Sequence, residues 1–331
     1  MKKLLALLFL TAATANAADV VIKSTTNRAE MNIGDYWIGE DFAAGFRKLG
    51  QEVDIDYRGE YASKHTPEPA LNVYMRGYTK FTPPFPKGKN VLYVYYPMWY
   101  GESSAKVWNK VELNARAPLP ENTNLDDDLQ NFDLIAVASP SYAEELKAAG
   151  INAVYVPQFT NPEKFYPAPE DGLKTGILFV GSNWHDRTSL RYAIESGFEV
   201  AVYGYNWGGV VPAEMYKAPY VANDELNRYY SSAKIVLNDH RPDMKAAGFV
   251  NNRIYDATAA GAMVISDYMP EIAAAYGDAV PMYKDKEELA ALLKYYLTHE
   301  DERLEKVRRA REITLKEFTN VAAAKRIFGG R

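Results

Sequence analysis

Cysteine is absent from the 331-residue sequence, so neither a disulfide framework nor a thiolate-ligated metal site can form. Only four histidines are present. No pair of them has the spacing of metal ligands on a helix or strand, so no metal site is expected. An excess of positive charge is also missing, because the formal net charge is −5, which argues against nucleic acid as a partner. Beyond residues 1–17, no segment is apolar enough to span a membrane.

The amino terminus has the pattern of a secretory signal peptide. Lys2 and Lys3 form a charged start, residues 4–10 form a short apolar segment, and residues 15–17 read Ala-Asn-Ala. The sequence therefore predicts a signal peptide over residues 1–17, cleaved after its last alanine. Export is expected, and the compartment is the periplasm if the source is a Gram-negative bacterium.

Short apolar runs alternate with helical patterns along the rest of the chain. Val, Ile and Tyr dominate the runs without strict alternation, which is typical of strands buried on both faces. Such alternation predicts an α/β fold with parallel sheets and right-handed crossovers. The runs cover residues 20–24, 53–57, 71–75, 91–96, 134–138, 153–157, 176–181, 199–204, 234–238, 262–266 and 279–283.

A stretch with three prolines and an acidic pair divides these runs into two series at residues 158–172. We therefore expect two doubly wound Rossmann-like domains that face each other across a cleft. The first domain is predicted over residues 18–160 and the second over residues 161–315. A terminal helix over residues 316–331 is expected to return to the first domain. Ligands of such sheets bind outside the carboxyl ends of the strands.

Three stretches resemble a known family. They are "FDLIAVASPSYAEELKAAGINAVYVPQFTNPEKFYP" (132–167), "ILFVGSNWHDRTSLR" (177–191) and "NNRIYDATAAGAMVISD" (251–267). Together they resemble GT-B glycosyltransferases of the spore-maturation-protein-like branch (glycosyl transferases group 1), best over residues 130–300.

This resemblance implies an acceptor domain followed by a donor domain. It implies transfer of a sugar from an activated nucleotide- or lipid-diphosphate donor to a glycan, protein or lipid. It also implies an enzyme that needs neither cofactor nor metal.

Donor-binding residues are expected after the first strand of the second domain. Gly181, Ser182 and Asn183 follow that strand, and a glycine lets backbone N–H groups approach a phosphate near a helix start. Arg187 lies six residues further on and has the fork geometry that binds a diphosphate, so we count it among the catalytic residues. The alternative is a tight strand-to-helix turn with a solvated arginine.

A second group of candidates lies in "NNRIYDATAAG". Arg253 and Asp256 are three apart, so they are neighbours on one helix face. The resemblance implies that Asp256 binds the ribose hydroxyls, and we expect the catalytic Arg253 to face phosphate. The alternative is a surface salt bridge. Gly261 closes the run of small residues and is counted with the donor-binding residues.

The sequence departs from the family at one position. Retaining GT-B enzymes carry two glutamates eight positions apart in this stretch. Asp256 stands at the second place, but Gly248 stands at the first and has no side chain. The family's contact with the donor sugar therefore has no counterpart at Gly248, which keeps an inactive relic open as an alternative.

Acceptor-binding residues are expected in the first domain. Gly34 and Asp35 are predicted in a loop at the cleft, where Tyr36 and Trp37 would stack on an acceptor sugar. The alternative places Trp37 in the core under the first helix.

A base for an inverting transfer is expected on the acceptor side. His65 is the only histidine there, and an imidazole can accept a proton near neutral pH, as a general base must. The alternative is a solvated loop histidine. Asp54 and Asp56 are expected to be solvated acids at a strand end.

The leading prediction is therefore a glycosyltransferase. Its rival is an exported two-domain protein that binds a solute or glycan and closes by hinge motion. Such receptors cross between their domains two or three times, whereas this sequence predicts one linker and one returning helix.

Overall fold

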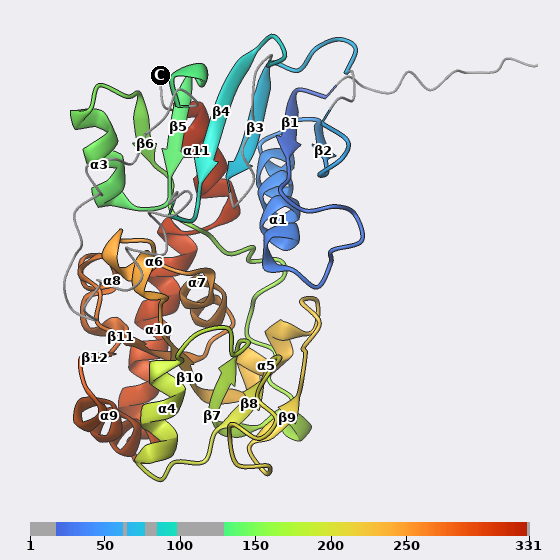
Figure 1. The fold of residues 1–331 in the computed structure, drawn as a ribbon. Coiled ribbons are helices and arrows are strands. Elements are labelled where there is room, and N and C mark those ends of the chain that lie inside the picture. Colours follow the sequence, from blue (N-terminus) through green and yellow to red (C-terminus); the bar gives the residue numbers. More distant parts are fainter. Residues whose placement is uncertain (1–17, 62–64, 77–84, 98–128, 330–331) are drawn as a thin grey trace, which may run out of the picture.

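The computed structural model describes residues 18–61, 65–76, 85–97 and 129–329, so the predicted signal peptide lies outside the described residues. Two parallel six-stranded sheets, each covered by helices, are stacked end to end (Figure 1). The prediction of two doubly wound α/β domains is confirmed. Among the described helices, none is both long and apolar enough to cross a membrane.

The first domain contains the sheet β2-β1-β3-β4-β5-β6. Its strands are β1 (Val20–Lys23), β2 (Val53–Asp56), β3 (Leu71–Arg76), β4 (Lys89–Val94), β5 (Leu134–Val137) and β6 (Ala153–Tyr155). Its helices are α1 (Gly34–Lys48), α3 (Pro140–Ala148) and, from the carboxyl terminus, α11 (Asn320–Gly329), with a short 3-10 helix at Leu129–Asn131.

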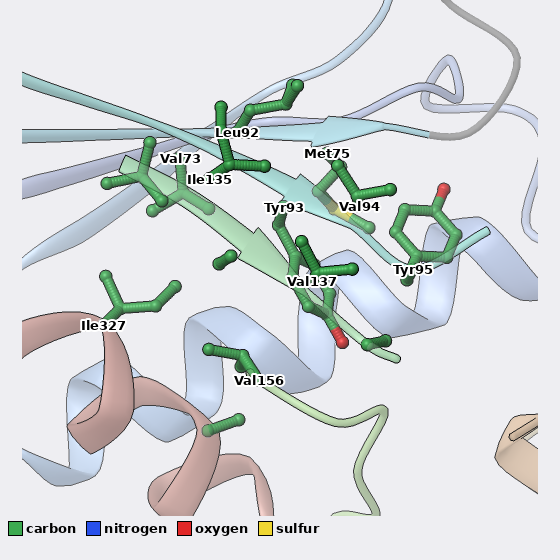
Figure 2. Packing of buried hydrophobic residues seen from close by; sticks show 14 of the residues in the cluster. Val73, Met75, Leu92, Tyr93, Val94, Tyr95, Ile135, Val137, Val156 and Ile327 are labelled. Carbon is green, nitrogen blue, oxygen red and sulfur yellow. The ribbon is translucent and has the colours of Figure 1, made fainter. Parts of the chain in front are cut away.

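The core of the first domain explains why the central strands read as continuous apolar runs. Leu92 of β4 and Ile135 of β5 are register partners, and Val73 lies on the adjacent strand β3; each of the three is at most 1% exposed (Figure 2). Ile327 of α11 packs into the same cluster, so the end of the chain completes a core begun by its first strands.

The second domain contains the sheet β12-β11-β10-β7-β8-β9. Its strands are β7 (Thr175–Val180), β8 (Ala201–Tyr203), β9 (Tyr216–Ala218), β10 (Ala233–Asn238), β11 (Met263–Asp267) and β12 (Met282–Tyr283). Its α-helices are α4 (Thr188–Glu195), α5 (Leu226–Ser232), α6 (Pro242–Ala246), α7 (Asn252–Ala259), α8 (Pro270–Tyr276), α9 (Lys286–Thr298) and α10 (Glu300–Glu317), with 3-10 helices at Asp171–Leu173 and Gly277–Ala279. The edge strand β9 was not predicted, because three half-exposed residues make no apolar run.

Two crossings join the domains within the described residues. The first follows β6, and the second leads from α10 to α11. The crossings lie side by side, because the Thr160 N–H donates to the Phe318 carbonyl (2.9 Å) and the Asn320 N–H donates to the Thr160 carbonyl (2.8 Å). Gly45 of α1 packs directly on them, since a Cβ there would lie 2.4 Å from the Asn320 carbonyl oxygen.

Candidate functional site

A cleft of about 320 Å³ lies between the two domains, at the carboxyl ends of their strands. This is where ligands of doubly wound sheets bind. The first domain contributes Asn32, Gly34, Trp37, Ile38 and Asp41. The linker and the second domain contribute Phe165, Val180, Gly181, Ser182, Gly204, Tyr205, Pro219, Tyr220, Val221, Asn223, Leu226, Tyr230, Asn252, Arg253 and Asp256.

Asp256 projects from α7 into this cleft and is only 6% exposed. Its Oδ2 accepts a hydrogen bond from Asn252 Nδ2 at 2.6 Å. Its Oδ1 is buried and has no partner among the described residues. Burial raises the pKa of Asp256 to about 8, against the lowering effect of Thr160 and Lys164. A buried acceptor without a donor is costly, so this oxygen is available for a ligand hydroxyl.

A second carboxyl group, Asp41 of α1, faces the cleft from the opposite domain. Burial raises its pKa, and the Lys164 ammonium, 3.6 Å away, opposes that rise. The same ammonium lies 4.1 Å from the centre of the Trp37 ring. Asp41 was not predicted from the sequence. In the middle of an amphipathic helix an aspartate reads as a solvated residue, and only the packing of the domains brings it to the cleft.

Arg253 lines the cleft, but it also links two strands of the second domain. Its Nε and Nη2 donate to the Val180 carbonyl at 3.2 and 2.8 Å, and its Nη1 donates to Asn238 Oδ1 at 2.8 Å. Gly181 permits this approach, since a Cβ there would lie 2.9 Å from Arg253 Nη2. The predicted neighbours Arg253 and Asp256 thus share the cleft while binding different partners.

The predicted phosphate loop is arranged differently from expectation. The helix after β7 begins only at Thr188, so Gly181 does not stand at a helix start. The N–H groups of Gly181 and Asn183 already donate to the carbonyls of Tyr203 and Tyr205, both at 2.9 Å. Ser182 and Gly181 line the cleft, whereas Asn183 does not.

Arg187 is likewise absent from the cleft lining. Its Nη1 donates to the buried Asp239 at 3.2 Å, and its Nε donates to the Ser182 carbonyl at 3.0 Å. Burial lowers the pKa of its guanidinium, although Asp239 opposes this effect. Arg187 is therefore neither the predicted phosphate-binding residue nor the solvated arginine of the alternative. It is a largely buried cation that links the start of α4 to the end of β10.

Two aromatic rings in the cleft were missed by the sequence reasoning. Tyr205 and Tyr220 stack at 6.2 Å between ring centres, and each is 38% exposed. Both follow the carboxyl ends of strands, β8 and β9 respectively, and this position was the available signal. Partly exposed parallel rings at a cleft wall are suited to stacking on a planar or sugar ligand.

The predicted acceptor residues form a helix turn instead of a loop. Gly34, Asp35, Tyr36 and Trp37 are the first turn of α1, although no side chain caps this helix. Gly34 and Trp37 reach the cleft. Asp35 faces Thr25 and Tyr95, and burial raises its pKa. Tyr36 stacks on Tyr57 at 5.4 Å. Packing of these side chains thus lets α1 begin at Gly34, before the amphipathic pattern that predicts the helix from the sequence.

His65 lies outside the cleft. Its Nε2 is 3.1 Å from both carboxylate oxygens of Asp56, and its Nδ1 is 3.3 Å from Asp54. Asp56 is not solvated as predicted, because it is 4% exposed and forms an ion pair with the buried Lys23. The acids at the end of β2 therefore hold His65 at a separate polar pocket at the edge of the sheet.

Gly248 and Gly261 of the second domain have roles in backbone conformation. Gly261 lies away from the cleft, where its φ of +85° ends α7 and a Cβ would meet Pro167 at 3.2 Å. Gly248 has a φ of +72°, and a Cβ there would lie 2.5 Å from a Glu271 oxygen and 2.7 Å from Ser141 Oγ. No side chain fits at Gly248 without displacing these groups.

The whole arrangement matches a known class of protein fold. Sucrose-phosphate synthase from Thermosynechococcus elongatus superposes with a TM-score of 0.64 at 13% identity, over 94% of this chain and 97% of that chain. A glycosyltransferase from Rickettsia africae superposes with a TM-score of 0.61 at 11% identity, over 94% and 97%. The T4 phage β-glucosyltransferase gives 0.57 at 13% identity, over 94% and 98%. The chain therefore has the GT-B glycosyltransferase fold.

Sequence comparison also relates the chain to glycosyltransferases. Residues 183–329 match a family described as glycosyl transferase-like. The spore protein CgeB of Bacillus subtilis (strain 168) is 29% identical over 171 residues, which are 46% of this chain and 53% of that protein. The predicted resemblance to GT-B glycosyltransferases is thus confirmed. The chain spans about half the length of this curated relative.

Proposed function

We propose that the chain transfers a sugar from a nucleoside diphosphate sugar that binds in the interdomain cleft. The observation that carries this proposal is the buried Asp256 Oδ1, which has no partner among the described residues and lines the cleft. A carboxylate oxygen is suited to the vicinal hydroxyls of a ribose because it accepts from both. Stacked Tyr205 and Tyr220 on the same cleft offer a surface for the base.

The leaving diphosphate requires positive charge. Arg253 supplies it at the cleft, although three of its five N–H groups already serve Val180 and Asn238. We propose that transfer proceeds without a metal or cofactor, through electrostatic stabilisation of the diphosphate. Comparison of transfer rates in a chelator and in Mn²⁺ tests this, because a metal-independent enzyme retains its rate in the chelator. The T4 phage enzyme has been crystallised with UDP and Mn²⁺, which makes Mn²⁺ the appropriate ion.

A thermal-shift panel of UDP, GDP, ADP and dTDP and their glucose or mannose derivatives tests the nucleotide assignment. UDP-glucose belongs in it because the T4 phage enzyme has been crystallised with it. A ligand at 100 times its Kd stabilises the folded protein by about 2.7 kcal/mol. If none of these compounds stabilises the protein, a nucleotide donor is contradicted and a lipid-diphosphate donor is left. The same assay tests that donor with an undecaprenyl diphosphate sugar in detergent.

A second candidate is a relic that binds the donor without turnover. Gly248 favours it, since the residue at the sequence position where the family carries a glutamate has no side chain, and the carboxylate nearby is that of Glu271. Slow release of free sugar from the selected sugar nucleotide distinguishes the two, because an active site hydrolyses its donor and a relic does not.

We also propose that the protein is exported after cleavage behind Ala17, with a glycan, protein or lipid as acceptor. The signal-like residues 1–17 support this proposal. Amino-terminal sequencing of the protein from the extracytoplasmic fraction tests it. A chain that keeps Met1 and stays in the cytoplasm contradicts it.

A further inference from the structure

A groove lies at the opposite end of the second domain from the cleft. It has a volume of about 620 Å³, and its lining includes Thr175 and Lys234, where β7 and β10 begin. The cleft is lined by Val180, the last residue of β7. Because residues of a strand are spaced about 3.3 Å apart, the length of β7 separates the two sites by about 16 Å. A ligand in this groove is therefore remote from the chemistry proposed for the cleft.

The groove contains an arginine that the protein pairs incompletely. Arg303 of α10 lines the groove, and its side chain is only 7% exposed. Its Nη2 donates to Glu300 Oε1 at 2.9 Å. Its Nε is buried and has no partner within the described part of the chain. A buried N–H group without an acceptor opposes folding, which indicates that a ligand supplies an acceptor near this guanidinium.

One nitrogen of this guanidinium remains accessible. Nη1 of Arg303, like Nε, has no acceptor among the residues that the structure describes, but unlike Nε it is not buried. A guanidinium holds its five N–H groups in a fixed plane, and this geometry suits the oxygens of a phosphate. Arg303 thus offers a positioned cation to a ligand in the groove.

The charge of the lining also suits an anion. Lys174 and Lys234 line the groove together with Arg303, and Glu300 is the one acid among the described lining residues. Lys174 is paired with Asp171 at 2.6 Å, whereas the exposed Lys234 has no side-chain partner in the described ranges. Three cations against one acid contrast with the formal net charge of −5 of the whole chain. This excess favours a doubly charged group such as a phosphate over a singly charged carboxylate.

The remaining walls of the groove suit the body of a small molecule. Pro167, Pro169 and Leu304 line it, and Leu304 is 48% exposed although it is apolar. Small-molecule sites combine such apolar walls with a few polar groups that fix the ligand, and the volume of the groove lies within their range.

We propose that this groove binds a small molecule through a phosphate group held between Arg303 and Lys234. The rest of the ligand lies against the two prolines and Leu304. The site is separate from the proposed donor site, and the inference does not depend on the proposed function.

Inorganic phosphate at pH 8 is the probe, and acetate at equal ionic strength is the singly charged control. In protein labelled with ¹⁵N-arginine, the Nε–H resonances missing from Arg303→Lys and from Arg253→Lys identify these two residues. We expect phosphate to shift the Arg303 resonance until it saturates, and acetate to leave this resonance in place.

The deciding variant is Lys234→Gln, because this exposed side chain has no described protein partner whose loss could disturb the fold. Lys316→Gln is the matched control, because the Lys316 side chain is 80% exposed and lies outside the groove. We expect Lys234→Gln to weaken phosphate binding by about tenfold, as for one lost charge-assisted hydrogen bond. Lys316→Gln should leave the affinity within twofold.

Three results would overturn the inference. An Arg303 resonance that phosphate does not move excludes a phosphate at this arginine, and so does a response confined to Arg253 of the cleft. An Arg303 shift that acetate reproduces excludes selection for a doubly charged group. Equal weakening in Lys234→Gln and Lys316→Gln shows general attraction of anions instead of a site. None of these results affects the proposed function, because no sugar donor is present in the experiment.

Discussion

Two buried aspartates, Asp56 of the first domain and Asp256 of the second, have opposite surroundings. Asp56 of the first domain, 4% exposed, is paired with the buried Lys23 and with His65. Asp256 of the second, 6% exposed, holds a single amide donor and keeps one oxygen unpaired. The exposed fraction therefore does not distinguish Asp56 from Asp256, but the number of charged and hydrogen-bonding partners of each carboxyl group does.

This difference indicates that Asp56 has a structural role and that Asp256 has a ligand-binding role. A buried charge with its countercharge contributes to folding, and removal of one partner leaves the other unpaired. A buried carboxyl without a countercharge opposes folding and is retained for a ligand. Stability measurements should therefore respond to Asp56, and binding measurements should respond to Asp256.

The largest effect is expected for Asp56→Ala. It leaves the Lys23 ammonium buried without its partner, which lowers the free energy of unfolding by about 3–5 kcal/mol. Chemical denaturation checks this value. Asp54→Ala is the control, because that side chain is 60% exposed and should change stability by about 0–1 kcal/mol. Similar losses in both variants would contradict the structural role of Asp56.

Asp256→Asn should lower the affinity for the selected nucleotide. Loss of the charge-assisted bond to the ribose costs about 1.5–3 kcal/mol, more than tenfold in Kd. Calorimetric titration above pH 8, where the Asp256 carboxyl is mostly ionised, checks it, with Asp41→Asn as a comparison from the opposite wall of the cleft. Unchanged affinity in Asp256→Asn would remove the main support for a nucleotide donor.

The same substitution should raise stability at high pH. The folded pKa of Asp256 is about 8 and its ordinary value is 3.8, so the protonated form is favoured by folding. Its contribution is fully present below pH 3.8 and is lost as pH rises toward 8. Asp256→Asn should therefore be more stable than the unmodified protein at pH 8 by a few kcal/mol, since each unit of pKa shift corresponds to about 1.4 kcal/mol, and equal to it near pH 4. Denaturation at both pH values measures the difference, and a constant difference would contradict the raised pKa.

The smallest effect is expected for His65→Asn. Because this histidine contacts only the acids of β2 among the groups described above, its removal costs about 1 kcal/mol of stability or less. Nucleotide affinity and sugar transfer should not change. A large loss of transfer with normal nucleotide binding would restore His65 as the base on the acceptor side.

The sequence predicted the sheets well because buried parallel strands leave apolar runs. It missed the start of α1, where Ile33 offers no capping side chain. The predicted residues that do line the cleft are Gly181, Ser182, Arg253 and Asp256 of the second domain and Gly34 and Trp37 of the first. Asp41 reaches it through the packing of one domain on the other, which no local pattern records.

The arginines show a different limit of sequence reasoning. Residue type and spacing predicted that both Arg187 and Arg253 bind phosphate. They do not show which protein acceptors already take the N–H groups of these arginines. Asp239 and the Val180 carbonyl take the donors that the pattern reserved for a ligand.

The two crossings that run side by side at Thr160 and Thr319 have a mechanical consequence. Two separate tethers would let the domains twist and slide, whereas two strands bonded to each other act as one flexible strip. Such a strip bends about a single axis and resists torsion. Any opening or closing of the cleft would then be one rotation about this strip, so little conformational entropy would be lost if a ligand drew the domains together. Gly45 is the contact point between α1 and this strip, because the helix packs on the Asn320 backbone with no side chain between them.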